Sequence, residues 1–162
     1  MIRLWTDGCC LKNPGGAGGW AVIAERGGDV LAQWSGSVES TTNNRMELTA
    51  VIEALREGAD GKTEIVSDST YVVKGVTLWL PRWKEKDYKR GRPRINIPNR
   101  SLWEEIDELI ADYLHPLRFR WVKGHAGGAF NEMADDLAGK EARAFKTKAE
   151  HKAERLEEEA RA

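Results

Sequence analysis

The stretch that decides the fold is residues 41–57, TTNNRMELTAVIEALRE. Its leading Thr and Asn residues are helix-capping types, so we expect a helix over Arg45–Glu57. Glu47 departs from the polar face of that helix. At about 100° per residue it points the same way as Ala50 and Ala54. A carboxylate that faces a core is costly, so a partner such as a cation is expected for it.

Three segments ahead of this helix read as strands. Ile2–Thr6 alternates and then meets Asp7-Gly8, which predicts a strand that ends in a turn. Trp20–Glu25 and Val30–Ser35 are separated by Gly27-Gly28, which predicts a β-hairpin. Together these segments predict an antiparallel meander of three strands.

The segments after the helix complete an α/β pattern. We expect a buried strand, a helix, an amphipathic helix, a second strand and a last helix that begins at a capping Asn131. The corresponding ranges are Glu64–Ser67, Ser69–Gly75, Ser101–Leu114, Leu117–Val122 and the residues after Asn131. The order predicts a mixed sheet of five strands with helices packed on both faces.

Composition indicates a globular chain of one domain. Of the 162 residues 41% are hydrophobic and 31% are charged, and no apolar run approaches the roughly 18 residues of a membrane span. Cys9 and Cys10 are adjacent, which suits neither a disulfide nor a zinc pair, and no signal peptide is expected ahead of the first strand. We expect a reduced, cytoplasmic monomer, with a domain over 1–142 and a charged helical or flexible tail over 143–162.

One segment, residues 74–100, concentrates positive charge in a chain whose net charge is −1. It holds nine Lys or Arg residues against Glu85 and Asp87, a local surplus of +7. Three prolines predict that it is broken into short pieces and loops. A localised basic segment is typical of a surface that binds an anion such as a nucleic-acid backbone.

Other acids stand at positions that suit a site. Asp7 and Asp68 follow predicted strands, although an Asp before Gly or before Ser-Thr is also an ordinary turn or cap residue. Asp135 faces inward on the last helix, whereas Asp136 has Lys140 four residues on, as in an exposed ion pair. The partner of Glu47 stays open between a metal ion, the side chain of Arg45 and a backbone amide. Carboxylates without a matching set of His or Cys favour magnesium or manganese over zinc.

Several runs resemble the type 1 ribonuclease H family in its bacterial form. They are Thr6–Gly8, Asn13–Gly15, Thr41–Leu48, Ser67–Val72, Trp121–Gly127 and Asn131-Glu132 with Asp135. The resemblance spans positions 6 to about 142 and implies a ribonuclease H-like fold. It implies a metal-dependent endonuclease that hydrolyses the RNA strand of RNA–DNA hybrids with two Mg2+ ions, with Mn2+ as a substitute.

The resemblance also implies roles for individual residues. The metal-binding catalytic carboxylates would be Asp7, Glu47, Asp68 and Asp135, with His125 as a mobile residue for proton transfer or product departure and Glu132 as an accessory acid. Contacts to the hybrid would come from Asn13, Asn43 and Asn44 in the minor groove, from Thr42 and Asn99 in a phosphate pocket, and from the basic segment as a handle with Trp79, Trp83 and Lys84. Helical spacing leaves it open whether the two tryptophans belong to the core instead.

The chain departs from the family's commonest pattern at a few positions. Ser40 stands where some members have Arg, and Gly128-Ala129-Phe130 replaces the usual loop continuation. Affinity and site preference are therefore expected to differ, whereas the four acids are intact. Two other functions stay open from the sequence: a nuclease of the same fold that cuts DNA, and a non-catalytic module that binds hybrids.

Overall fold

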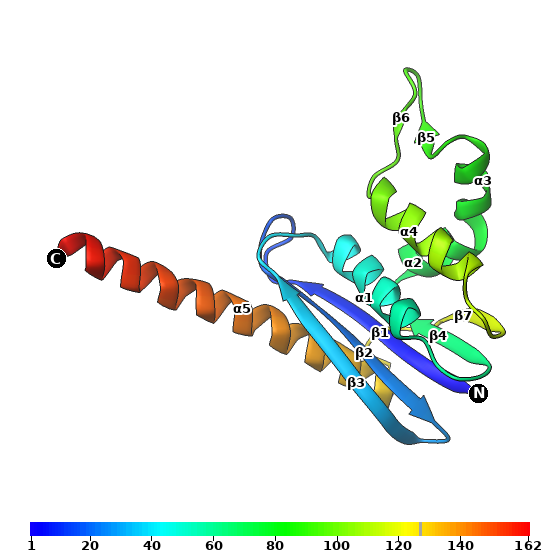
Figure 1. Ribbon diagram of the computed structural model, residues 1–162, viewed down its shortest axis with the longest axis horizontal. Coiled ribbons are helices and arrows are strands. Elements are labelled where there is room, and N and C mark those ends of the chain that lie inside the picture. The colour runs from blue at the N-terminus through cyan, green and yellow to red at the C-terminus, as the bar shows by residue number, and fades with distance from the viewer. Residues whose placement is uncertain (127) are drawn as a thin grey trace.

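The computed structural model, which describes residues 1–126 and 128–162, is a five-stranded sheet with helices on both faces (Figure 1). The strand order is β3-β2-β1-β4-β7, and β5 and β6 form a separate ribbon. The strands of the main sheet are β1 (Ile2–Cys10), β2 (Gly18–Arg26), β3 (Asp29–Val38), β4 (Thr63–Ser67) and β7 (Leu117–Trp121). The first three are antiparallel neighbours, whereas β4 runs parallel to β1 and β7 runs parallel to β4. The predicted mixed sheet is confirmed.

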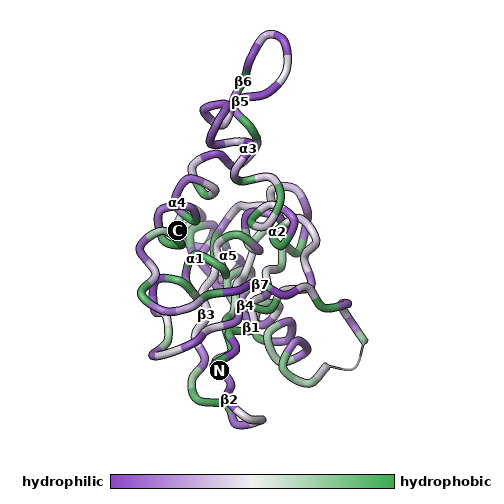
Figure 2. Tube along the Cα trace, turned by 90° about the vertical axis from the view of Figure 1, so that its right-hand side faces the viewer, coloured by the Kyte–Doolittle hydropathy of each residue, from purple (hydrophilic) through white to green (hydrophobic). Residues whose placement is uncertain are grey.

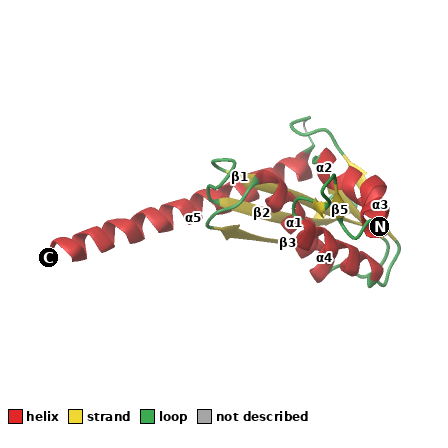
Figure 3. Cartoon of the chain, turned by 90° about the horizontal axis from the view of Figure 1, so that it is seen from above, coloured by secondary structure: helices red, strands yellow, loops and turns green. Residues whose placement is uncertain are grey.

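Two helices form the layer on one face of the sheet, and one long helix covers the other (Figures 1 and 3). Helix α1 (Asn43–Glu57) packs on β1 and β2 with α4 (Arg100–Ala111) beside it, and α5 (Ala129–Arg161) lies across β1, β2 and β3. The core lies between the sheet and the α1–α4 layer. Its fully buried members include Leu4, Leu48, Ile65, Trp103 and Ile106. Burial of these apolar side chains fixes α1 over the centre of the sheet.

Two predicted element boundaries are wrong. β1 does not end at Asp7 but continues to Cys10, with Gly8 paired to Trp20 of β2. Asn131 does not cap the last helix, because α5 begins two residues earlier and has no side-chain cap bond. At α1 the cap is Thr42, whose Oγ1 accepts a hydrogen bond from the Arg45 amide at 3.2 Å.

The basic segment is more helical than its prolines predicted. Helix α2 (Thr70–Lys74) continues through a π-helical turn, η1 (Gly75–Trp79), into α3 (Leu80–Glu85). Pro81 lies in the first turn of α3, where the missing amide hydrogen costs little. The second half forms the two-stranded ribbon, β5 (Lys89–Arg90) and β6 (Ile95–Asn96), which stands away from the sheet as a hydrophilic projection (Figure 2).

The C-terminal part of α5 extends well beyond the sheet (Figure 1). Residues 148–162 are exposed throughout. Within the described ranges, none of the helices is both long and apolar enough to span a membrane.

Candidate active site

Three carboxylates from three elements meet at one edge of the sheet. Asp7 lies within β1, Glu47 in the first turns of α1, and Asp68 directly after β4. One carboxylate oxygen of each lies within 4.8 Å of one oxygen of the other two. Because β1 and β4 are parallel neighbours, residues near their carboxyl ends reach the same edge. The structure thus brings together three of the four acids that the sequence singled out.

Gly8 allows α1 to approach β1 closely enough for this meeting. A Cβ atom at Gly8 would lie 2.3 Å from the backbone nitrogen of Glu47 and 2.3 Å from the carbonyl carbon of Met46. No side chain fits in that space. A glycine inside a strand often marks a close approach of another backbone, and here that backbone is the start of α1. Asp7 and Gly8, which suggested a turn, instead lie within β1, where Asp7 supplies an acid of the site and Gly8 contacts α1.

Burial makes two of these acids, Asp7 and Glu47, reluctant to ionise when no cation is present. Asp7 is 3% exposed, and burial together with the nearby charges of Asp68 and Asp135 raises its pKa to about 8. Burial, then the charges of Asp7 and Asp68, also raises the pKa of Glu47 well above its usual range, although a hydrogen bond from the Gly8 amide opposes the shift. Within the described residues, the Glu47 Oε2 atom is buried without a hydrogen-bond partner.

These features fit a divalent cation. The expected alternative partner Arg45 instead donates to Asn99 Oδ1 at 3.3 Å, and the Gly8 amide meets only part of the acceptor capacity of Glu47. A cation would supply the positive charge that the buried acids lack and would occupy the orphaned oxygen of Glu47. Carboxylate oxygens are ligands that suit Mg2+ and Mn2+.

Asp135 joins this group from the opposite side of the sheet. It lies on α5, is half-buried, and is close enough to Asp7 to help raise the pKa of Asp7, whereas Asp136 next to it is exposed. Asp135 is outside the set of three oxygens within 4.8 Å. His125 and Glu132 are both exposed, and His125 has a positive φ of 55° in the loop between β7 and α5. Gly127 in that loop lies outside the described residues.

The amides expected to contact a duplex cluster around the start of α1. Asn13 Oδ1 accepts from the Asn43 amide at 3.2 Å, and Asn43 Oδ1 accepts from the Cys10 amide at 2.7 Å. Among the described residues, neither NH2 group has a hydrogen-bond acceptor, so both can bind an acceptor from outside. Asn44 is exposed beside them.

A second polar group links α1 to the start of α4. The Arg45 amide donates to Thr42 and its guanidinium donates to Asn99, so Arg45 bridges the two residues expected in a phosphate pocket. Asn99 has a left-handed backbone conformation and donates to the Tyr71 hydroxyl at 3.2 Å. Thr42 and Asn99 are thus brought to one place by contacts within the chain.

The tryptophans of the basic segment pack against each other in a tilted arrangement rather than presenting two free aromatic faces. Ring centroids are 5.7 Å apart for Trp79 and Trp83, and 5.0 Å apart for Trp83 and the buried Trp103. Trp83 packs against the core, and both indoles line the walls of a hollow of about 560 Å3 whose remaining lining is largely Lys and Arg. Lys84 does not line it, because it forms an ion pair with Asp107 of α4 at 3.1 Å.

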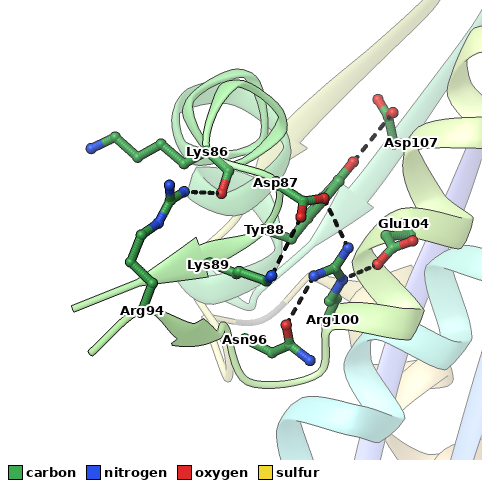
Figure 4. A network of polar contacts seen from close by, with 9 residues as sticks. All are labelled: Lys86, Asp87, Tyr88, Lys89, Arg94, Asn96, Arg100, Glu104 and Asp107. Atoms are coloured by element: carbon green, nitrogen blue, oxygen red, sulfur yellow. Dashed lines mark hydrogen bonds and ion pairs between the residues drawn. The ribbon is translucent and has the colours of Figure 1, made fainter. Parts of the chain in front are cut away.

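A polar network ties the ribbon to α4 (Figure 4). Asp87 pairs with Lys89 at 3.6 Å and with Arg100 at 3.1 Å, and Arg100 also pairs with Glu104. Tyr88 donates to Asp107 at 3.4 Å, and burial with the Asp107 charge raises the pKa of Tyr88 to about 12. Asp87 of the basic segment, together with Glu104 and Asp107 of α4, therefore holds the projection in place.

The architecture and the acid cluster can now be set beside known proteins. The sequence model described as RNase H matches residues 1–143. The chain belongs to the RNase H family. Ribonuclease H of Neisseria meningitidis serogroup C is 44% identical over 145 residues, which cover 89% of this chain and 97% of that protein. Ribonuclease H of Paracidovorax citrulli is 46% identical over a match that covers 86% of this chain and 93% of that protein.

Solved structures of RNase H proteins share the fold. LC9-RNase H1, described as a type 1 RNase H with the type 2 active-site motif, superposes with a TM-score of 0.77 at 35% identity, over 89% of this chain and 72% of that chain. LC11-RNase H1, solved in complex with an RNA/DNA hybrid, superposes with a TM-score of 0.68 at 22% identity, over 89% of this chain and 98% of that chain. The predicted ribonuclease H-like fold is confirmed.

Sequence reasoning missed three residues of this RNase H that shape the site or the sheet. Gly8 and Asn131 lie at the acid cluster. Glu64 of β4 is 1% exposed and forms ion pairs with Arg3, Arg118 and Arg120, each within 3.1 Å. Glu64 could have been found as an acid inside a short apolar strand, since a buried carboxylate requires such partners. Gly8 and Asn131 carry no comparable signal in their own segments.

Proposed function

We propose that this RNase H hydrolyses the RNA strand of RNA–DNA hybrids as an endonuclease and leaves 5′-phosphate and 3′-hydroxyl ends. The observation that carries the proposal is the group formed by Asp7, Glu47 and Asp68, with its buried, unpartnered Glu47 oxygen and the raised pKa of Asp7. Family membership supports it, since relatives 44–46% identical are named ribonuclease H.

The acids would hold two Mg2+ ions, for which Mn2+ could substitute. Asp7, Glu47, Asp68 and Asp135 are the residues that would bind them. When bound, such ions lower the pKa of water and stabilise charge on a phosphodiester. The chain's part is to keep the four carboxylates fixed in place, with Asp7 buried and the other three half-buried, so that little reorganisation is needed during the reaction.

His125 suits a transient role in proton transfer. It is exposed on the loop that precedes α5, where it can reach solvent and a bound strand. A histidine exchanges protons near neutral pH, so it could take a proton from the attacking water or give one to the leaving 3′ oxygen.

Strand choice would rest on the amides. The free NH2 groups of Asn13 and Asn43, with Asn44 beside them, can bond 2′-hydroxyls and base edges in a wide minor groove. Thr42 and Asn99 would take a phosphate of the DNA strand, and cations around the 560 Å3 hollow would bind its backbone further along. We place this activity in the cytoplasm and assign it to a monomer, with residues 1–142 as the catalytic domain and 143–162 as an accessory tail.

Cleavage of three labelled duplexes tests the proposal. An RNA–DNA hybrid should be cut in Mg2+ or Mn2+ and not in EDTA, whereas double-stranded RNA and double-stranded DNA should stay intact. Asp68→Asn should abolish cleavage while binding of the hybrid remains measurable. Cutting of double-stranded DNA would instead favour a DNA nuclease of the same fold, and hybrid binding without cleavage by the unmodified protein would favour a non-catalytic module.

A further inference from the structure

Asp68 is held by three groups that come from the end of β7, from the loop after it and from the first turn of α5. The Trp121 indole Nε1 donates to the Asp68 backbone oxygen at 2.9 Å. The Asn131 Nδ2 atom donates to Asp68 Oδ2 at 3.3 Å. Gly124 lies so close that a Cβ there would come within 2.9 Å of the same carboxylate oxygen. The direction of the Asp68 carboxylate is therefore set from outside its own strand.

Of these three groups, only Asn131 bonds the carboxylate with its side chain. Its NH2 group must face the carboxylate, because an amide oxygen there would repel it. Asn131 is 5% exposed, and its other polar atom, Oδ1, is buried without a hydrogen-bond donor among the residues that the structure describes. A buried acceptor left without a donor is unfavourable, so something outside the described chain is expected to supply one.

The place of Asn131 on α5 relates it to the rest of the acid cluster. It lies four residues before Asp135, so both side chains project from the same face of the helix. Asp135 is a close neighbour of Asp7 of β1, and Asn131 is hydrogen-bonded to Asp68, which follows β4. One face of α5 thus contacts both acids that the sheet contributes.

We propose that Asn131 is a positioning residue of the metal centre, whose NH2 group orients Asp68 toward the ions and whose Oδ1 accepts a hydrogen bond from an ion-bound water. An amide suits this task because it supplies a donor and an acceptor without a fifth negative charge. Partners that orient metal-binding carboxylates in this way influence both metal affinity and turnover. The inference rests on the proposed function of the same site.

Metal binding without substrate provides the first test. The Mg2+ concentration at half of the Mg2+-induced rise in unfolding temperature is measured for the full chain and for Asn131→Ala and Asn131→Gln. We expect Asn131→Ala to need about tenfold more Mg2+, and Asn131→Gln to recover part of this loss. Ser35→Ala is the matched control, because Ser35 donates to Glu141 of α5 at 2.9 Å and so joins the same helix to the sheet away from the acids.

Turnover at saturating Mg2+ provides the second test. Asn131→Ala should lower kcat for a hybrid by about 10-fold to 100-fold and leave KM within about twofold, since Asn131 orients a metal ligand rather than the duplex. The proposal would be overturned if Asn131→Ala lost only thermal stability in EDTA and kept the Mg2+ midpoint and kcat of the unmodified protein. It would also be overturned if Ser35→Ala shifted the Mg2+ midpoint by the same amount as Asn131→Ala. If the unmodified protein binds Mg2+ but cuts no hybrid, the proposed function fails, while the Mg2+ titration still decides the role of Asn131.

Discussion

Replacing Asp7 with Asn should make the metal-free protein more stable, by an amount that grows with pH. Asp7 is buried beside Asp68 and Asp135, and its pKa in the folded chain is about 8. The unfolded chain releases that proton near the ordinary aspartate pKa of 3.8. Asn has nearly the same shape as a protonated Asp but carries no charge at any pH, so the substitution removes the cost of an ionised group in this place.

The sign and the size of the effect follow from linkage. Because the folded pKa is raised, the folded state keeps a proton that the unfolded chain has lost, so stability falls as pH rises from about 4 toward 8. One pKa unit corresponds to about 1.4 kcal/mol, so between pH 5.5 and pH 8 this one group should cost the unmodified protein on the order of 3 kcal/mol. The stability advantage of Asp7→Asn should widen by that amount over the same interval.

Urea unfolding in EDTA, followed by circular dichroism at several pH values, measures this difference. Asp29→Asn is the control, because Asp29 is an exposed acid at the turn between β2 and β3 and should leave the pH dependence unchanged. In millimolar Mg2+ the advantage of Asp7→Asn should shrink or reverse, since the ion stabilises only the chain with its acids intact. Stability curves for Asp7→Asn and the unmodified protein that run parallel from pH 5.5 to pH 8 in EDTA would refute the reasoning.

Three further predictions address the helix contact, the sheet and the basic segment. Gly8→Ala should lower the free energy of unfolding in urea by more than about 2 kcal/mol, because the added Cβ collides with the backbone of α1. The same collision should weaken Mg2+ binding, and unchanged Mg2+ binding would contradict this. Glu64→Gln should lower the free energy of unfolding by about 1 kcal/mol at pH 7, and that difference should vanish in acid. Burial raises the pKa of Glu64, but the bond from Arg118 and the neighbouring arginines lower it overall, so its contribution is lost as pH falls below about 4.5. Arg92→Ala should reduce the slope of log affinity for the hybrid against log salt concentration by about one phosphate contact. Lys84→Ala should leave that slope unchanged, because Lys84 is already paired with Asp107. Equal slopes in the two variants would argue against this difference between the two cations.

The basic segment shows where charge counting and structure diverge. The sequence correctly indicated a concentrated positive region but treated its cations as equivalent. In the structure Lys84 forms an ion pair with Asp107 of α4, and Lys89 and Arg100 form ion pairs with Asp87, whereas Arg92 lines the hollow beside the tryptophans without such a pair among the described residues. The two acids that seemed to dilute the segment differ, since Asp87 is one of the residues that anchor it (Figure 4).

The sequence by itself determined the mixed sheet and the inward direction of Glu47. Hydrophobic periodicity reports which way a side chain points from its own helix or strand, and that was enough to separate Glu47 from the polar face of α1. Asp7 and Asp68 gave no such signal, because an acid before Gly or Ser is an ordinary turn or cap residue. Their place in the site depended on the family resemblance.

Only the tertiary structure decided that the acids meet and what holds them. Gly8 determines how closely α1 approaches β1, and Asn131, expected to cap a helix, instead bonds Asp68 across 63 positions of sequence. Periodicity carries no information about the distance between two elements, because that distance is set by which backbone and side-chain atoms pack between them. The same packing buries Asp7 and the Oε2 atom of Glu47, and so favours a cation beside acids whose residue types alone would have suited a solvated surface.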